Sequence, residues 1–224
     1  MEWTFEIIRF LPLAWQNELV NNYIKYHSDE LDKCIENEIE MWIYIHTHIL
    51  YMVFIYFQLL RISQLKKEEF KHSLMFVQDK DKRLNDTILD PFSFSGVNEK
   101  TVFRFFRLIG FDDGTIGNIS HCVNGRNDIL HASWNHISEL DKKVGMYVRN
   151  MERIVCKSED FFREIFEKFR DENPDLFEEW YDVWWEDLES NLYIQYHISD
   201  YERSKIVEWI KTWKVIEAIK KEIE

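Results

Sequence analysis

A run of twenty residues without Asp, Glu, Lys or Arg, at positions 41–60, constrains the fold more than any other stretch. A helix needs about 20 apolar residues to cross a bilayer, so the length suits a membrane span. The run also holds His46, His48 and three tyrosines, which are costly in hydrocarbon. A helix that is apolar nearly all round can instead cover the apolar faces of amphipathic neighbours. We therefore predict the central helix of a water-soluble bundle and consider a membrane span the less favoured alternative.

The composition favours an all-α fold. The chain has 224 residues, enough for one domain with a sizeable core. Gly (6) and Pro (3) are scarce and 16% of the residues are aromatic, which favours long packed helices over a sheet. The best strand-like stretch, 191–197, is expected to be a loop or a short extended piece. We predict an up-and-down bundle of long helices in residues 1–170, with additional C-terminal helices in 171–224 packed on it. A single domain over 1–224 remains the alternative.

The periodicity of apolar residues predicts where the helices lie. The expected helices are 2–26 with an interruption at Pro12, 29–64 capped by Ser28, 98–108 stopped by Gly110, 115–138 capped by Thr115, 142–170 and 200–224. A loop is expected at 84–96. Gly125 should weaken its helix by about 1 kcal/mol relative to alanine.

Cysteine usage and charge restrict the setting. Cys34, Cys122 and Cys156 are widely spaced, without a CxxC motif, which indicates a reducing cytosol and buried, inert thiols. The first residues have no signal-peptide pattern, so a cytoplasmic protein is expected. The formal net charge of −13 argues against non-specific coating of nucleic acid, which needs a broad positive surface. A narrow site with local Arg and Lys remains compatible with it.

A stripe of short, uncharged polar residues runs along the helix expected at 115–138. It consists of Ser120, Asn124, Asn127, His131, Asn135 and Ser138. A solvent-facing stripe normally carries Lys and Glu, so this one suits a partly buried surface or the lining of a cleft. Arg126 lies roughly 140° around the helix from His131. The two side chains meet only if Arg126 bends inward or a second chain contributes.

The sequence Arg126-Asn127-Asp128-Ile129-Leu130-His131 resembles the signature of the HEPN superfamily. That signature is an Arg, a polar residue that is often Asn, a few residues and then a His, on a helix of an all-α bundle. Outside this helix the chain shares only helical character. The resemblance implies a metal-independent endoribonuclease of the toxin or phage-defence kind. It also implies an RNA substrate, no cofactor and no metal, and a homodimer in which two motifs meet in one cleft; a cognate antitoxin or regulatory partner would fit.

The chemistry of the motif residues fits this implied role. His131 titrates near neutrality and can act as base or acid. The planar guanidinium of Arg126 matches phosphate oxygens, and Asn127 can orient the imidazole or bind phosphate. The further candidates for substrate binding are Asn124, Asn135, His136, Arg104 and Arg107.

Other interpretations stay open. Arg126 can salt-bridge a glutamate and His131 can be a satisfied polar core residue, which leaves a non-catalytic HEPN-like dimerisation or partner-binding module. The acidic, tryptophan-rich segment 175–188 would suit a partner surface. Arg104 and Arg107 are equally suited to outward salt bridges, and the basic region 66–83 to a solvated face rather than an RNA-binding patch.

His46 and His48 are expected to be core or interface histidines. Two residues apart on a helix, they point about 200° away from each other and cannot bind one metal from one face. One of them can face the polar stripe of the 115–138 helix.

Overall fold

The computed structural model describes residues 3–12, 17–74, 90–130, 139–173 and 195–223. Within these residues the regular structure is helical, apart from an isolated β-bridge between Pro12 and Ser199, so the all-α class is confirmed. The α-helices are α1 (Trp3–Ile8), α2 (Glu18–Glu36), α3 (Glu40–Leu65), α4 (Lys67–Ser73), α5 (Glu99–Val102), α6 (Asp113–Leu130), α7 (Leu140–Lys157), α8 (Glu159–Glu172) and α11 (Asp200–Ile223). The 3-10 helices are η3 (Pro91–Phe94) and η4 (Phe103–Ile109).

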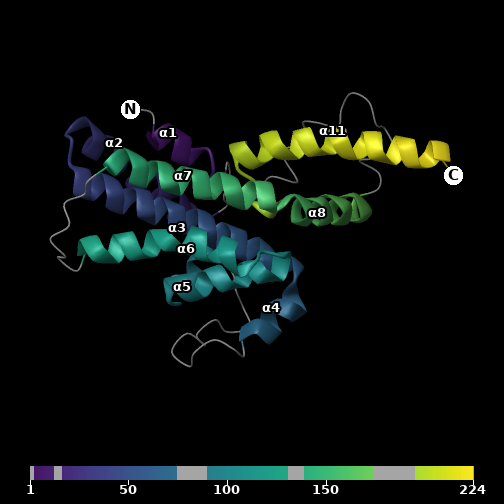
Figure 1. The fold of residues 1–224 in the computed structure, drawn as a ribbon, viewed down its shortest axis with the longest axis horizontal. Helices are drawn as coiled ribbons and strands as arrows, with labels where there is room; N and C mark the ends of the chain where they lie inside the picture. The colour runs from purple at the N-terminus through teal and green to yellow at the C-terminus, as the bar shows by residue number, and fades with distance from the viewer. Residues whose placement is uncertain (1–2, 13–16, 75–89, 131–138, 174–194, 224) are drawn as a thin grey trace.

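Helix α3 lies at the centre of the bundle (Figure 1). It packs against α1, α2, α4, α6, α7, η3 and η4, and residues 50–63 are all buried. Among the described residues it is the one helix long and apolar enough to cross a bilayer, and 89% of its most apolar window is buried inside the protein. Other helices thus cover the surface that lipid would contact, as expected for the central helix predicted from the sequence.

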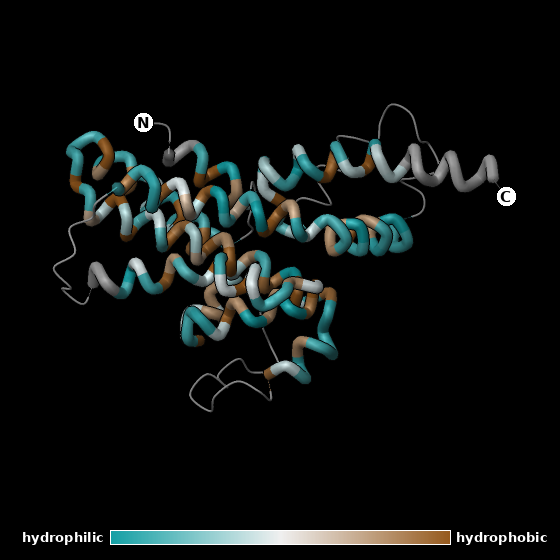
Figure 2. Tube along the Cα trace, in the orientation of Figure 1, coloured by the Kyte–Doolittle hydropathy of each residue, from teal (hydrophilic) through white to brown (hydrophobic). Residues whose placement is uncertain are grey.

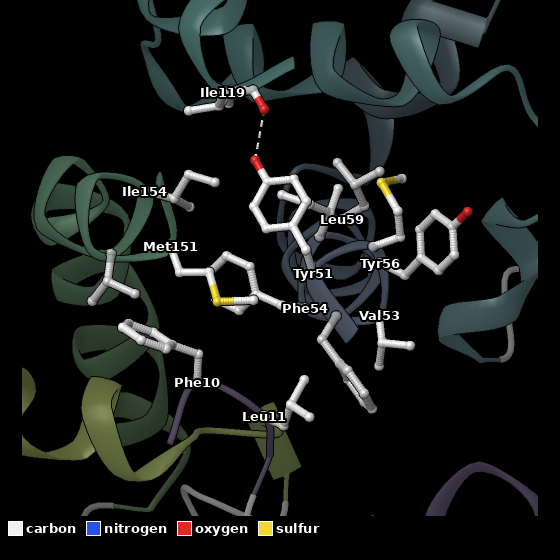
Figure 3. Packing of buried hydrophobic residues seen from close by; sticks show 14 of the residues in the cluster. Phe10, Leu11, Tyr51, Val53, Phe54, Tyr56, Leu59, Ile119, Met151 and Ile154 are labelled. Carbon is white, nitrogen blue, oxygen red and sulfur yellow. Dashed lines mark hydrogen bonds between the residues drawn. The ribbon is translucent and has the colours of Figure 1, made fainter. Parts of the chain in front are cut away.

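Side chains of α3 point toward several of the surrounding segments (Figure 3). The Tyr51 hydroxyl donates a hydrogen bond of 2.7 Å to the carbonyl oxygen of Ile119 in α6. On another side, the Phe54 ring meets Phe10 edge-on, with 6.0 Å between ring centroids. Met151 of α7 is also fully buried in this cluster. The core is therefore one continuous cluster around α3.

The helices next to α3 run in alternating directions. α2 and α3 are antiparallel and joined by a tight turn, in which Glu38 is left-handed (φ 55°). α6 and α7 also run in opposite directions (Figure 1). Hydrophilic and hydrophobic residues are interleaved along α7 and α8 (Figure 2). The buried side of these two helices matches the apolar side predicted for 142–170 and contains Val144, Tyr147, Met151, Ile154, Val155, Phe162, Ile165, Phe166 and Phe169.

Two predicted helix boundaries in the first part of the chain are wrong. Ser28 does not begin a helix, because α2 continues through it and its hydroxyl donates to the Ile24 carbonyl at 2.9 Å. The helix break lies instead at 37–39. The predicted interruption at Pro12 is present: α1 ends at Ile8 and residues 9–12 are not helical. After residues 13–16, which lie outside the described part of the chain, the Asn17 side chain accepts a hydrogen bond from the Leu19 amide and caps α2.

Several later boundaries also differ. The helix expected at 142–170 is two helices separated at Ser158, whose hydroxyl donates to the Ile154 carbonyl at 2.7 Å. Most of the segment expected as one helix at 98–108 is the 3-10 helix η4, and Gly110, with a φ of 84°, ends it as predicted. Thr115 is not a helix cap: the Asp112 carboxylate accepts from the Thr115 amide at 2.7 Å, so α6 begins at Asp113.

Some expectations lie wholly or partly outside the described residues: the last turns of the 115–138 helix, the tryptophan-rich segment 175–188, half of the basic region 66–83 and parts of the 84–96 and 191–197 segments. Of the cysteines, Cys34 and Cys122 are buried as predicted, and burial raises the pKa of the Cys122 thiol to about 12. Cys156 is exposed, so the prediction of a buried thiol is wrong there.

A buried ion pair fastens α11 to α3. The Arg61 guanidinium donates from Nη1 to Oε2 of Glu202 at 3.1 Å and from Nη2 to Oε1 at 2.5 Å, and both side chains are 1% exposed. Gln58 also donates to this carboxylate, and the guanidinium lies over the Phe162 ring of α8. The start of the C-terminal helix is therefore part of the core. The division of the chain after residue 170 stays a prediction.

Replacing Glu202 by Gln should strongly destabilise the fold. The change leaves the Arg61 charge buried without its carboxylate, which costs about 3–5 kcal/mol of unfolding free energy. Urea denaturation measures the loss. Glu208→Gln is the matched control, because this residue pairs with Lys205 on the surface of the same helix, and it should shift the midpoint far less. Equal midpoints for the two variants would contradict the assignment of the Arg61–Glu202 pair as a core contact.

Candidate active site

Helix α6 positions the residues singled out in the sequence. It packs through Ile116, Ile119, Cys122 and Val123, all buried, so the predicted apolar face is confirmed as far as the structure describes it. The residues of the polar stripe beside this face differ in solvent exposure: Asn124 is exposed, whereas Ser120 and Asn127 are half-buried. The first five motif residues, 126–130, are helical.

Arg126 belongs to a polar network that runs from the surface into the core. Its Nη2 forms an ion pair with Oε2 of Glu99, the first residue of α5. The same oxygen lies 3.4 Å from Nε2 of His48 in α3, and Nδ1 of His48 lies 3.1 Å from the Tyr147 hydroxyl of α7. The Arg126 and Glu99 side chains are 22% and 24% exposed, but that of His48 is 4% exposed. Four helices therefore meet at one chain of polar contacts, which opens to solvent at Arg126 and Glu99.

Local sequence explains why these side chains converge. The Asn98 side chain caps α5 by accepting from the Lys100 amide at 3.0 Å, which places Glu99 in the first turn, where the helix dipole favours a carboxylate. Gly125 lies directly before Arg126, and a Cβ there would collide with the Tyr44 hydroxyl of α3. The glycine that weakens α6 thus allows α6 to approach α3 closely beside the network.

The network holds Glu99 as an anion. Burial alone would raise the pKa of this carboxyl group, but the contacts with His48 and Arg126 outweigh burial, and the net pKa lies below its usual value. The pKa values of two nearby tyrosines are instead raised above the usual value. Burial raises the pKa of Tyr147, and burial together with the Glu99 charge raises that of Tyr56. Both phenols therefore keep their protons at neutral pH. The Tyr147 hydroxyl lies 3.4 Å from the Cys122 carbonyl and 3.1 Å from His48, and its one proton serves a single acceptor.

The structure places the predicted substrate-binding residues in different regions. Arg107 donates from Nε and Nη2 to Oδ1 of Asp113, at 2.9 and 2.6 Å, the outward salt bridge that was the alternative for it. Asp113 begins α6, so this pair lies about 20 Å along the helix from Arg126 at 1.5 Å per residue. Arg104 is exposed on η4 and Asn124 is exposed near Arg126. His131, Asn135 and His136 lie outside the described residues. The structure thus does not bring Arg107 to Arg126. Asn124 and Asn127 share α6 with Arg126 but lie roughly 200° and 100° around the helix from it.

Sequence reasoning did not identify Glu99 or Tyr147. No local signal marks Glu99 among the 41 acidic residues of the chain, although the Asn98 cap before it is recognisable. His48 is a core histidine as expected, but its described contacts are with Glu99 of α5 and Tyr147 of α7 and not with the polar stripe of α6. His46 points elsewhere, toward His27, so the expectation that His46 and His48 diverge is confirmed. In the part of the chain that the structure describes, no three His, Cys, Asp or Glu residues are grouped to hold a metal ion.

Comparison of the chain with models of protein families, with curated proteins and with solved structures returned no match. The functional assignment therefore rests on the residues and their geometry.

Replacing Arg126 by Ala should destabilise the fold moderately. The change removes one partner of the half-buried Glu99 carboxylate, and loss of a hydrogen bond to a charged group costs about 1–3 kcal/mol. Chemical denaturation compares the variant with Arg104→Ala, an exposed arginine on the neighbouring η4 whose loss should change stability by about 0.5 kcal/mol or less. If both variants are as stable as the wild type, Arg126 is not held by Glu99 in solution.

Proposed function

We propose that this chain is a metal-independent endoribonuclease of the HEPN type, a cytoplasmic toxin or phage-defence effector that cleaves RNA through Arg126, Asn127 and His131. The observation that carries the proposal is the setting of Arg126. The Arg126 side chain, 22% exposed, lies at the outer end of a buried polar network, on a helix that is described to Leu130, the residue before His131. No cofactor is required in this proposal.

The contacts of Arg126 leave it suited to phosphate. Among the contacts described, Nη2 of its guanidinium is engaged with Glu99, and Nε is buried. The donors left for a ligand are therefore those on Nη1 and Nη2. Arginine has five N–H donors in a planar fork that matches phosphate oxygens. Glu99 fixes one edge of the fork and restricts its rotamers. The remaining donors are then pre-organised for the phosphorane, on which negative charge builds up during cleavage.

The reaction needs a base and an acid as well as this electrostatic support. A base removes the proton from a ribose 2′-OH, and the 2′-oxygen forms a bond to phosphorus. The bond from phosphorus to the 5′-oxygen breaks, and an acid protonates that oxygen, which leaves a 2′,3′-cyclic phosphate. His131 serves in both roles because imidazole titrates near neutrality. In a homodimer with two motifs in one cleft, one His131 is the base and the other the acid.

The His131→Ala variant tests the proposal. Purified wild-type protein should cleave single-stranded RNA in the presence of EDTA. The variant should cleave it at a rate lower by a factor of about 100 or more, the usual contribution of a general acid or base. His121→Ala is the matched control, since His121 is an exposed histidine of α6, ten residues before His131 in the sequence, and this variant should retain full activity. Unchanged cleavage by the His131 variant, or wild-type cleavage that EDTA abolishes, would contradict the proposal.

One observation favours a second candidate function. The ion pair between Arg126 and Glu99 is the structural role that a non-catalytic HEPN-like module would give this arginine. In such a module the helix would serve dimerisation or the binding of a partner, an antitoxin for example. Absence of RNA cleavage by the wild-type protein, together with a stable dimer in light scattering, would favour this candidate.

A further inference from the structure

Aromatic side chains gather on the outer side of α2 and at the start of α3. Tyr23 and Tyr26 of α2 both contact the His27 ring, with centroids 4.4 and 5.1 Å apart. His27 lies 5.2 Å from the ring of His46 in α3, and His46 lies 5.9 Å from Trp42. These five rings form one connected cluster, which we call the aromatic patch. The two histidines are the more buried rings of the patch, and their Nδ1 atoms lie 3.0 Å apart.

The upper rings of the patch are open to solvent. Tyr23 is 39% exposed, Tyr26 58% and Trp42 48%. Leu19 adds a 78% exposed leucine one turn before Tyr23, and Ile39 and Met41 beside Trp42 are 44% and 46% exposed. Apart from Ile8, these six are the large hydrophobic side chains exposed on the part of the protein that the structure describes. Such a concentration of exposed apolar residues marks an interaction site.

The exposed residues of α2 form a separate stripe from its buried ones. Val20, Leu31 and Cys34 face the core. At 100° per residue, Leu19, Tyr23 and Tyr26 lie within an arc of roughly 60° beside that buried face. The stripe from Leu19 to Tyr26 is about 10 Å long, which equals two turns of a helix laid along it. α2 is therefore amphipathic toward the core and presents a second apolar stripe outward.

Acidic residues dominate the surroundings of the patch. Residues 17–42 contain seven Asp and Glu and two Lys, a formal charge of 2 − 7 = −5. Lys33 is paired with Glu30 at 2.6 Å, whereas Asp29, Glu36 and Glu40 are exposed beside the patch on α2 and at the start of α3. An acidic rim attracts a partner of positive charge and repels partners of negative charge.

We propose that the aromatic patch binds a basic polypeptide segment that presents apolar side chains at helical spacing, a cationic amphipathic helix. Tyr and Trp are the residues that most often anchor protein interfaces, and a partner helix would pack its apolar side chains against these rings. Its Lys and Arg residues would face Asp29, Glu36 and Glu40. A second copy of this chain fits poorly, because it would bring another −5 to the same surface. Nucleic acids and anionic membranes carry the wrong charge as well.

The proposed interface is independent of the proposed ribonuclease. None of Arg126, Glu99, His48 and Tyr147 belongs to the aromatic patch, so binding is measured without reference to RNA cleavage. The partner class also fits a regulatory protein or antitoxin whose basic segment would sit apart from the motif helix.

Calorimetric titration of the full chain with an 18-residue synthetic peptide tests the proposal. The peptide has Leu at helical spacing on one face and Lys elsewhere, and a second peptide has Glu in place of Lys. We expect binding of the Lys peptide, no binding of the Glu peptide, and at least a tenfold loss of affinity in the Tyr26→Ser/Trp42→Ser variant. Ile8→Ser is the control for loss of an exposed apolar side chain outside the patch and should bind like the wild type. Because Tyr26 and Trp42 are exposed, the double variant should keep the wild-type circular dichroism and urea midpoint.

Five results would overturn the proposal, and four of them come from the peptide titrations and light scattering. They are no binding of the Lys peptide, equal affinity of the wild type and the double variant, equal binding of the Lys and Glu peptides, and a wild-type dimer in light scattering that the double variant dissociates. The last result would show a second copy on the patch. Sedimentation with phosphatidylcholine vesicles that depends on Trp42, without peptide binding, would assign the patch to a lipid surface and also overturn it.

Discussion

The burial of α3 is the constraint on which the rest of the structure depends. A helix with twenty successive uncharged residues, as at 41–60, is stable in water only when other helices cover it nearly all round, and α1, α2, α4, α6, α7, η3 and η4 do so. Buried polar groups must then find partners within the protein. The polar residues of α3 therefore decide how the outer helices dock: Tyr51 bonds to α6, His48 contacts Glu99 of α5 and Tyr147 of α7, and Arg61 pairs with Glu202 of α11.

The two ionic contacts of α3 differ in exposure. The buried contact has a structural role, and the partly exposed one belongs to the proposed site. The Arg61–Glu202 pair is closed to solvent and serves only to fix α11. The network around His48 starts in the core and ends at Arg126 and Glu99, where about a quarter of each side chain meets solvent. A binding or catalytic arginine needs a network that is held rigidly in the core at one end and reaches solvent at the charged end. The proposed phosphate-binding role of Arg126 follows from this position.

The sequence predicted the helical class, the central helix and the apolar sides of α6, α7 and α8, because hydrophobic periodicity reports which faces are buried. It failed where two local signals compete. Ser28 resembles a helix cap, but its hydroxyl bonds back to Ile24 within a continuing helix. Thr115 resembles one too, but Asp112 caps α6 instead. Of the polar network, the sequence singled out Arg126 through a short motif, whereas the pairing with Glu99 joins residues far apart in the chain and leaves no local pattern. The placement of His131 remains a prediction.

Native-state hydrogen exchange of the α3 amides, in buffer without detergent, tests the central claim most directly. If α3 is the covered core of a bundle in water, the amides of residues 50–63 should be the slowest in the chain to exchange. Their opening free energy should equal that of global unfolding measured with urea, because they open only when the whole fold opens. Exchange of these amides at a much lower opening free energy, or a chain that stays in solution only with detergent, would contradict the account.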